Sequence, residues 1–126
     1  MNLPNKEKTF DFECVGETTG KTYDGRFTVL CVLNIGQKHA LALEKTRLLG
    51  SYSNPTDDLV GYSLILSSLR IKVVDGPEWW KQSRGGLVVD DEEPLVKLYQ
   101  KIQEVEEEWK KDLKEKAEKL QQAATP

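Results

Sequence analysis

Hydrophobic and polar residues alternate along two segments near the N-terminus, 8–16 (KTFDFECVG) and 23–34 (YDGRFTVLCVLN). The apolar positions of one face are Phe10, Phe12 and Cys14 in the first segment, and Phe27, Val29, Cys31 and Leu33 in the second. An alternation of period two, enriched in aromatic and β-branched residues, is typical of strands. With a polar link at Gly20, the two segments predict a β-hairpin.

Two helices are predicted next. Residues 37–49 (QKHALALEKTRLL) have high helix propensity and are followed by Gly50, a common helix stop. After a loop at 51–54, a second helix is expected to begin at Asn54-Pro55, with Asn54 as its N-cap. Its apolar residues recur at helical spacing up to the break at 75–77 (DGP), and they are Leu59, Tyr62, Leu66, Leu69 and Val73.

A short helical turn at 77–80 (PEWW) and a bend at 83–86 (SRGG) lead into the last helix. Asp90 or Asp91 is expected to cap it, before an acidic first turn. Its apolar stripe contains Leu95, Leu98, Ile102, Val105, Trp109, Leu113 and Leu120. A helix over 92–120 measures roughly 43 Å, whereas a compact chain of this length has a radius of gyration of about 14 Å. We therefore predict that the helix extends past its own domain and ends in a frayed tail over 121–126.

Together these elements predict an α+β fold. An N-terminal antiparallel β-hairpin packs on short helices, and a long charged amphipathic C-terminal helix follows. The predicted organisation is a small α+β domain over 1–90 and the C-terminal amphipathic helix with its tail over 91–126.

The charge of the chain argues against nucleic acid and anionic membranes as binding partners. The 126-residue chain has 31% charged residues and a net charge of -3, all of which is carried by residues 91–126. A pI near 5.3 without a basic block gives no electrostatic footprint for nucleic acid or an anionic membrane. No apolar run approaches the roughly 20 residues that cross a bilayer, and residues 1–8 lack the apolar stretch of a signal peptide. We expect a protein that is made and kept in a reducing cytoplasm.

The two cysteines, Cys14 and Cys31, both fall in predicted strands. If the hairpin turns at 19–21, Cys14 lies opposite Phe27 and Cys31 opposite Phe10. The sulfurs are then roughly 13 Å apart along the sheet, too far for a disulfide, although a different register would bring them together. We predict free, buried thiols that pack as small hydrophobic side chains.

Groups that carry catalysis are scarce. His39 is the only histidine and lies in a stretch predicted to be exposed, so a His-dependent triad has a single candidate base. One histidine and two separated cysteines do not match zinc-ligand spacings. The carboxylate runs at 90–93 and 104–108 are typical of solvated helix ends and faces, and Gly85-Gly86 is interpreted as a bend rather than a phosphate loop. We predict no enzymatic activity, no cofactor, no metal site and no small-molecule substrate.

The tryptophans are candidates for a protein interface. On a helix the adjacent Trp79 and Trp80 diverge by about 100°, so both cannot face one core. Either one ring lies in the core and the other lies flat over the fold, or the second ring is an interface anchor, a role in which Trp is enriched. We predict a helix-in-groove or helix–helix interface. Its residues are Trp79 or Trp80 as one anchor and the stripe Leu98, Ile102, Val105 and Trp109 as the other.

The same tryptophans have a few basic neighbours, Lys72, Lys81 and Arg84. Aromatic and basic residues together bind single-stranded nucleic acid in other proteins. Nearby acidic residues at 75 and 78 offset the positive charge. We therefore expect no nucleic-acid binding.

Six segments, taken in order, carry a resemblance to a known family. They are TFDFEC at 9–14 with GE at 16–17, GRFTV at 25–29, EKTRLLG at 44–50, NP at 54–55, PEWW at 77–80 and LVKLY at 95–99. In this order they resemble small tail-assembly chaperones and related virion-assembly proteins of tailed bacteriophages. The likeness spans about residues 9–120 and is one of layout, because none of these segments is a chemical signature.

The resemblance implies a protein without enzymatic activity that helps to build a phage tail in the host cytoplasm. In such families the usual role is to coat the tape-measure protein and to recruit tail-tube subunits, so the expected partners are other phage proteins and the chain itself. Some similar proteins are permanent parts of the virion. The alternatives are therefore a structural protein of the mature particle, such as a decoration, neck or tail subunit, and a small regulatory or nucleic-acid-binding accessory protein.

Overall fold

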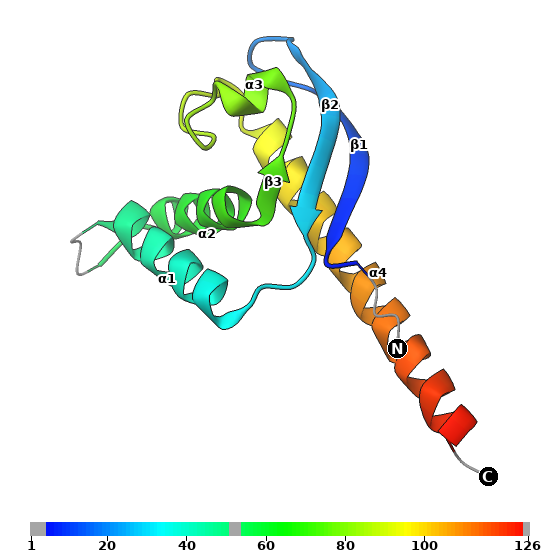
Figure 1. The fold of residues 1–126 in the computed structure, drawn as a ribbon. Helices are drawn as coiled ribbons and strands as arrows, with labels where there is room; N and C mark the ends of the chain where they lie inside the picture. The colour runs from blue at the N-terminus through cyan, green and yellow to red at the C-terminus, as the bar shows by residue number, and fades with distance from the viewer. Residues whose placement is uncertain (1–4, 51–53, 125–126) are drawn as a thin grey trace.

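The computed structural model describes residues 5–50 and 54–124 (Figure 1). In chain order its elements are β1 (Glu7–Val15), β2 (Thr22–Leu30), α1 (Ile35–Leu49), α2 (Asp57–Lys72), β3 (Val73–Asp75), α3 (Glu78–Lys81) and α4 (Glu93–Ala124). The predicted α+β class is confirmed, with an N-terminal hairpin, short helices and a long C-terminal helix.

The strands β1 and β2 form the predicted hairpin in a register that differs from the expected one. Phe10 pairs with Phe27, and Cys14 pairs with Tyr23. The expected pairs, Cys14 with Phe27 and Phe10 with Cys31, are therefore wrong. The connecting loop covers 16–21, and its centre lies nearer the N-terminus than expected. Its backbone is bound by the side chain of Asp91, just before α4, which no local pattern indicates.

Both cysteines are free and buried, as predicted. Cys14 lies near the closed end of the hairpin, opposite Tyr23. Cys31 lies at the open end, where its backbone N–H donates to the carbonyl of Lys6 (2.7 Å). Burial raises the pKa of the Cys31 thiol, which favours the protonated form that packs in the core.

A third strand, β3, was not predicted. It pairs antiparallel with β2, so the sheet order is β1-β2-β3. Val73, which we assigned to the helical stripe, is the first residue of this strand. Two successive β-branched residues, Val73 and Val74, favour an extended backbone, and a neighbouring strand edge is present to receive them.

The helix boundaries follow local capping chemistry. Asn34 forms a capping box with Gln37, and α1 therefore starts two residues before the predicted 37 and ends at Leu49, before Gly50, as expected. The cap of α2 is Thr56, whose hydroxyl accepts from the N–H of Leu59 (3.2 Å), and not Asn54. Most of the loop predicted at 51–54 lies outside the described residues. The last helix continues to Ala124, past the point where we expected fraying, and 125–126 lie outside the described residues.

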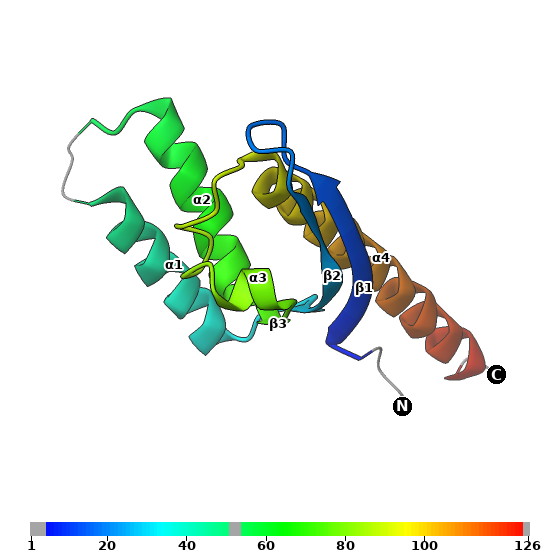
Figure 2. The same ribbon diagram turned by 90° about the horizontal axis from the view of Figure 1, so that it is seen from above.

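The core lies between the inner face of the hairpin and the first half of α4. Its buried residues are Phe12, Cys14, Tyr23, Phe27, Val29, Cys31, Leu69, Leu98, Ile102, Val105 and Trp109. Figure 2 shows α2 between α1 and the sheet, while α4 runs along the sheet and past its end. The core therefore contains residues from both sides of the predicted boundary at residue 90.

Substitution of Trp109 tests whether the first half of α4 packs in the core. The ring is buried, and its Nε1 donates to the carbonyl of Asn5 (2.9 Å). We expect Trp109→Ala to lower the free energy of unfolding by about 3 kcal/mol or more, because it leaves a cavity in the core. Leu120→Ala, on the exposed part of the same helix, should change it by less than about 0.5 kcal/mol. Urea denaturation followed by circular dichroism measures both, and equal effects would contradict the burial of Trp109.

Candidate protein-interaction surfaces

Four residues that we predicted as an interface lie in the core. Leu98, Ile102, Val105 and Trp109 are buried and pack with the inner-face residues of β1 and β2. The structure therefore corrects the expectation that this stripe is free for a partner, because the hairpin of the same chain covers it. The helix does extend past the sheet, as predicted (Figure 1), and Leu113 still packs against the core.

Trp79 and Trp80 belong to an aromatic cluster. The ring centroid of Trp79 lies 5.1 Å from that of Tyr23 and 5.7 Å from that of Phe27, and Trp80 lies 6.3 Å from Phe27. The Nε1 of Trp79 also donates to the carbonyl of Asp24 (2.9 Å). Both rings are half-buried against the core, so each keeps an exposed part, and their role as interface anchors stays a prediction. The two side chains diverge, yet both reach Phe27.

The two lysines near these tryptophans have acidic partners. Lys72 forms a partly buried ion pair with Glu106 of α4 (2.6 Å), and Lys81 lies 3.5 Å from Asp75. A lysine that is already paired inside the fold contributes little to phosphate binding, because its charge is neutralised.

Asp91 anchors the hairpin turn to the start of α4. Its side chain is 1% exposed, and it accepts hydrogen bonds from the N–H of Thr18 (2.8 Å), the N–H and hydroxyl of Thr19 (3.0 and 2.5 Å) and the hydroxyl of Tyr23 (2.7 Å). Burial alone would raise the pKa of Asp91, but these donors lower it to about 2. The predicted helix cap is therefore wrong at Asp91, whose carboxylate bonds to the turn instead of to the backbone of α4.

Gly16 makes this anchor possible. A Cβ at that position would lie 2.1 Å from Cγ of Asp91, which is far inside van der Waals contact. Any side chain at residue 16 would therefore displace either the carboxylate or the turn that it holds.

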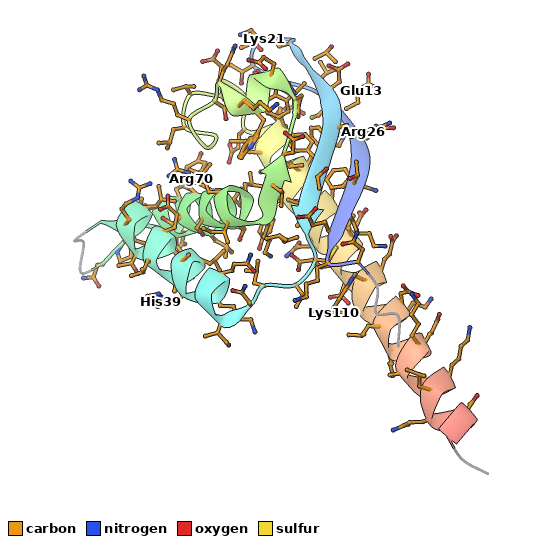
Figure 3. The ribbon with its side chains drawn as sticks, in the orientation of Figure 1. Glu13, Lys21, Arg26, His39, Arg70 and Lys110 are labelled. Atoms are coloured by element: carbon orange, nitrogen blue, oxygen red, sulfur yellow. The ribbon has the colours of Figure 1, made fainter. Side chains whose placement is uncertain are left out.

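Arg70 joins α1, α2 and the loop after α3. Its guanidinium donates to the carboxylate of Glu44 on α1 and to the carbonyls of Gly85 (3.1 Å) and Arg84 (3.0 Å). Figure 3 shows Arg70 on the side of α2 that faces this loop. Hydrogen bonds from Arg47 and Arg70 lower the pKa of Glu44 to about 2, against the opposing effect of its partial burial. This network holds α1 in place even though α1 has no buried residue.

One face of α1 is uncovered. Its exposed positions recur at helical spacing as Ile35, His39, Ala42, Leu43 and Thr46, and we call these five residues the α1 outer face. Ile35 is 78% exposed and Leu43 is 58% exposed. The helix packs on α2 and lies on its outer side (Figure 2). The α1 outer face is therefore open to a partner.

The end of α4 is a second open surface. We call residues 110–122 the distal segment. Apart from the half-buried Asp112, Leu113 and Lys116, its side chains are exposed, and Figure 3 shows Lys110 where the helix leaves the sheet. The ion pair between Lys116 and Asp112 (3.6 Å) lies within the helix. Beyond Leu113, which still packs against the core, the distal segment thus continues the amphipathic pattern without the hairpin above it.

The described residues contain no group of three or more His, Cys, Asp or Glu that would hold a metal ion. His39 lies on the exposed α1 outer face, as we expected for a solvated helix residue. None of the helices in 5–50 and 54–124 is long and apolar enough to cross a membrane. No protein-family model, curated protein or solved structure matches this chain.

Ile35, Leu43 and Arg70 were not singled out from the sequence. The helix that contains Ile35 and Leu43 is apolar around much of its circumference, so only the position of α2 decides which of its residues remain exposed. Arg70 has the appearance of an ordinary basic residue in the last turn of a helix. Its partners Glu44 and Gly85 are distant in sequence, and no motif indicates the network.

Acid stability tests the Asp91 anchor. The pKa of its carboxylate is about 2 when folded and close to 3.8 when unfolded, so its contribution is present above pH 4 and is lost as the pH falls toward 2. Asp91→Asn should lower the thermal midpoint at pH 7 and reduce by about one the number of protons taken up on unfolding near pH 3. Thermal melts between pH 2 and 7 measure both quantities. Tyr23→Phe, which removes one donor, should produce a smaller decrease, and an unchanged pH dependence in Asp91→Asn would contradict the anchor.

Proposed function

We propose that this chain is a non-enzymatic tail-assembly protein of a tailed bacteriophage that binds another assembly protein through the α1 outer face. The observation that carries the proposal is the exposure of Ile35 and Leu43 on a helix that has no buried residue. Large apolar side chains gathered on one face of a soluble protein mark sites of protein contact. The interface predicted on α4 is occupied by the fold itself, so binding is assigned to a surface that the fold leaves open.

The α1 outer face suits a helical or extended partner. Its apolar residues lie along one side of a 15-residue helix, which is a rigid and nearly straight element. Glu44 and Arg70 fix that helix to the rest of the fold on the opposite side. Binding therefore requires little ordering of α1, and less of the binding free energy is lost to conformational entropy.

The biological setting of the proposal comes from the family resemblance. It suggests the tape-measure protein or a tail-tube subunit as the partner, contacted in the host cytoplasm during assembly. Paired lysines and the acidic net charge favour this role over the alternative of a nucleic-acid-binding accessory protein. The exposed α1 outer face also fits a permanent virion subunit, which binds its neighbours by the same chemistry.

Substitution on the α1 outer face tests the binding role. Ile35→Asp combined with Leu43→Asp should reduce co-purification with the tape-measure protein of the same phage by about tenfold or more, because each change places a charge in an apolar contact. Val15→Asp is the control, since Val15 is as exposed as Leu43 (57% and 58%) but lies on the outer face of the sheet. Circular dichroism verifies that both variants fold. Equal retention of the partner by all three proteins would contradict the proposal.

The composition of purified virions separates the two assembly roles. A chaperone leaves before the particle is complete, so quantitative mass spectrometry of virions should detect none of this chain above the level of host contaminants. A fixed copy number relative to the tail-tube protein would show instead that the chain is a permanent structural subunit.

A further inference from the structure

An open cleft of about 390 Å³ lies between α2, the segment 86–92 and the first turns of α4. Its apolar lining includes Leu66, Leu87 and Leu95. Tyr62 and Leu87 at its edge are 47% and 56% exposed. Exposed apolar side chains around a concave surface are typical of a site that another group fills.

The rim of this cleft is negatively charged. Asp90, Glu92 and Glu93 line it, and among its described lining residues there is no lysine, arginine or histidine. Asp90 also lies 3.6 Å from Lys21, on the exposed side. The charge of Glu92 raises the pKa of Tyr62. One oxygen of Glu93, Oε2, is buried without a hydrogen-bond partner among the described residues. An apolar group accompanied by positive charge would match both the lining and the rim.

The distal segment of α4 has this chemistry. Residues 110–122 contain five lysines and three acidic residues, so they are positive although the whole chain is negative. Leu113, Ala117 and Leu120 share one side of the helix, because they are spaced by four and three residues. Lys110 and Lys116 flank that side. Leu120 is exposed at its far end, beyond the cover of the hairpin.

The distal segment cannot reach the cleft of its own chain. Both belong to α4, which is one continuous helix of 32 residues. At 1.5 Å per residue, Glu93 and Ala117 are roughly 36 Å apart along its axis. A distal segment that occupies this cleft must therefore come from another molecule.

We propose that the distal segment of one copy docks in the acidic cleft of a second copy. Leu120 enters between Tyr62 and Leu87, and Lys116 approaches the carboxylates of the rim. The cleft holds a few side chains rather than a whole helix, so the rest of the distal segment lies across its opening. The proposal concerns different residues from the α1 outer face and does not depend on it.

The two surfaces are different, so two copies can form this contact in two ways. Copies related by a two-fold axis each dock a distal segment in the other's cleft, which closes a dimer. A contact that is repeated head to tail leaves a free cleft at one end and generates rings or open filaments. Both arrangements predict association that increases with concentration.

Sedimentation velocity of the full-length protein over a range of concentrations tests this. The average mass should rise with concentration to that of a dimer or beyond, and 0.5 M NaCl should lower it by screening the charges. A protein that stays monomeric at every concentration would overturn the proposal.

Two variants assign the surfaces. The distal variant carries Lys116→Glu and Leu120→Asp, and the cleft variant carries Leu87→Lys and Glu92→Lys. Each should weaken association by about tenfold or more. Lys111→Glu, on the opposite side of α4, and Glu13→Lys, on the outer face of the sheet (Figure 3), are the matched controls and should assemble like the unaltered protein. Controls that weaken association as much as the variants would overturn the proposal.

Mixing the two variants tests whether a distal segment contacts a cleft. The distal variant keeps a working cleft and the cleft variant keeps a working distal segment, so an equal mixture should form a 1:1 complex that does not grow. Pairing of two distal segments would instead leave the cleft variant associated with itself and give no complex between the two variants, which would overturn the proposal. Because all of these variants keep the α1 outer face, co-purification with the tape-measure protein reports separately on the proposed function.

Discussion

The burial of the α4 stripe beneath the β1–β2 hairpin is the contact on which the rest of this structure depends. Two strands alone do not form a stable sheet in water. The charged helix α4 packs on another element only through its apolar side. Leu98 and Ile102 meet the inner face of the hairpin, and each element supplies the cover that the other lacks. Residues of α2 and α3 complete the apolar cluster that this contact forms.

Two polar networks then fix how the remaining parts are placed. Asp91 holds the hairpin turn against the start of α4, and Arg70 holds α1 and the 84–85 backbone against α2. Apolar packing has little directional preference, whereas a buried carboxylate with several donors has a single favourable geometry. These networks therefore determine orientation, while the core supplies most of the stability. Gly16 shows how closely the parts approach, because the Asp91 carboxylate occupies the space of its missing side chain.

The functional proposals follow from how the apolar surface is divided. The fold buries the apolar stripe of α4 with Trp109, and it partly buries Trp79 and Trp80. These are the most conspicuous apolar residues of the sequence. What remains is the α1 outer face, the cleft beside Tyr62 and the distal segment of α4. The last two differ in charge and lie at opposite ends of one helix, so that a single chain presents both halves of a contact. A protein with such surfaces suits an assembly role, in which one face binds copies of itself and another binds a different protein.

The sequence by itself determined the hairpin, the four helices, the buried free cysteines and the projection of α4, because each of these depends on local periodicity, on composition or on the length of a helix. It did not determine the hairpin register, the strand β3 or the partner of Asp91, because these depend on residues that are distant along the chain. The same reason explains the error over the interface. An amphipathic stripe shows that Leu98 and Trp109 are buried against other apolar residues, but it does not show whether those residues belong to the same chain. The tertiary structure places β1 and β2 over the first half of α4 and leaves the second half open. Only this arrangement determines which part of the stripe belongs to the core and which part is exposed to a partner.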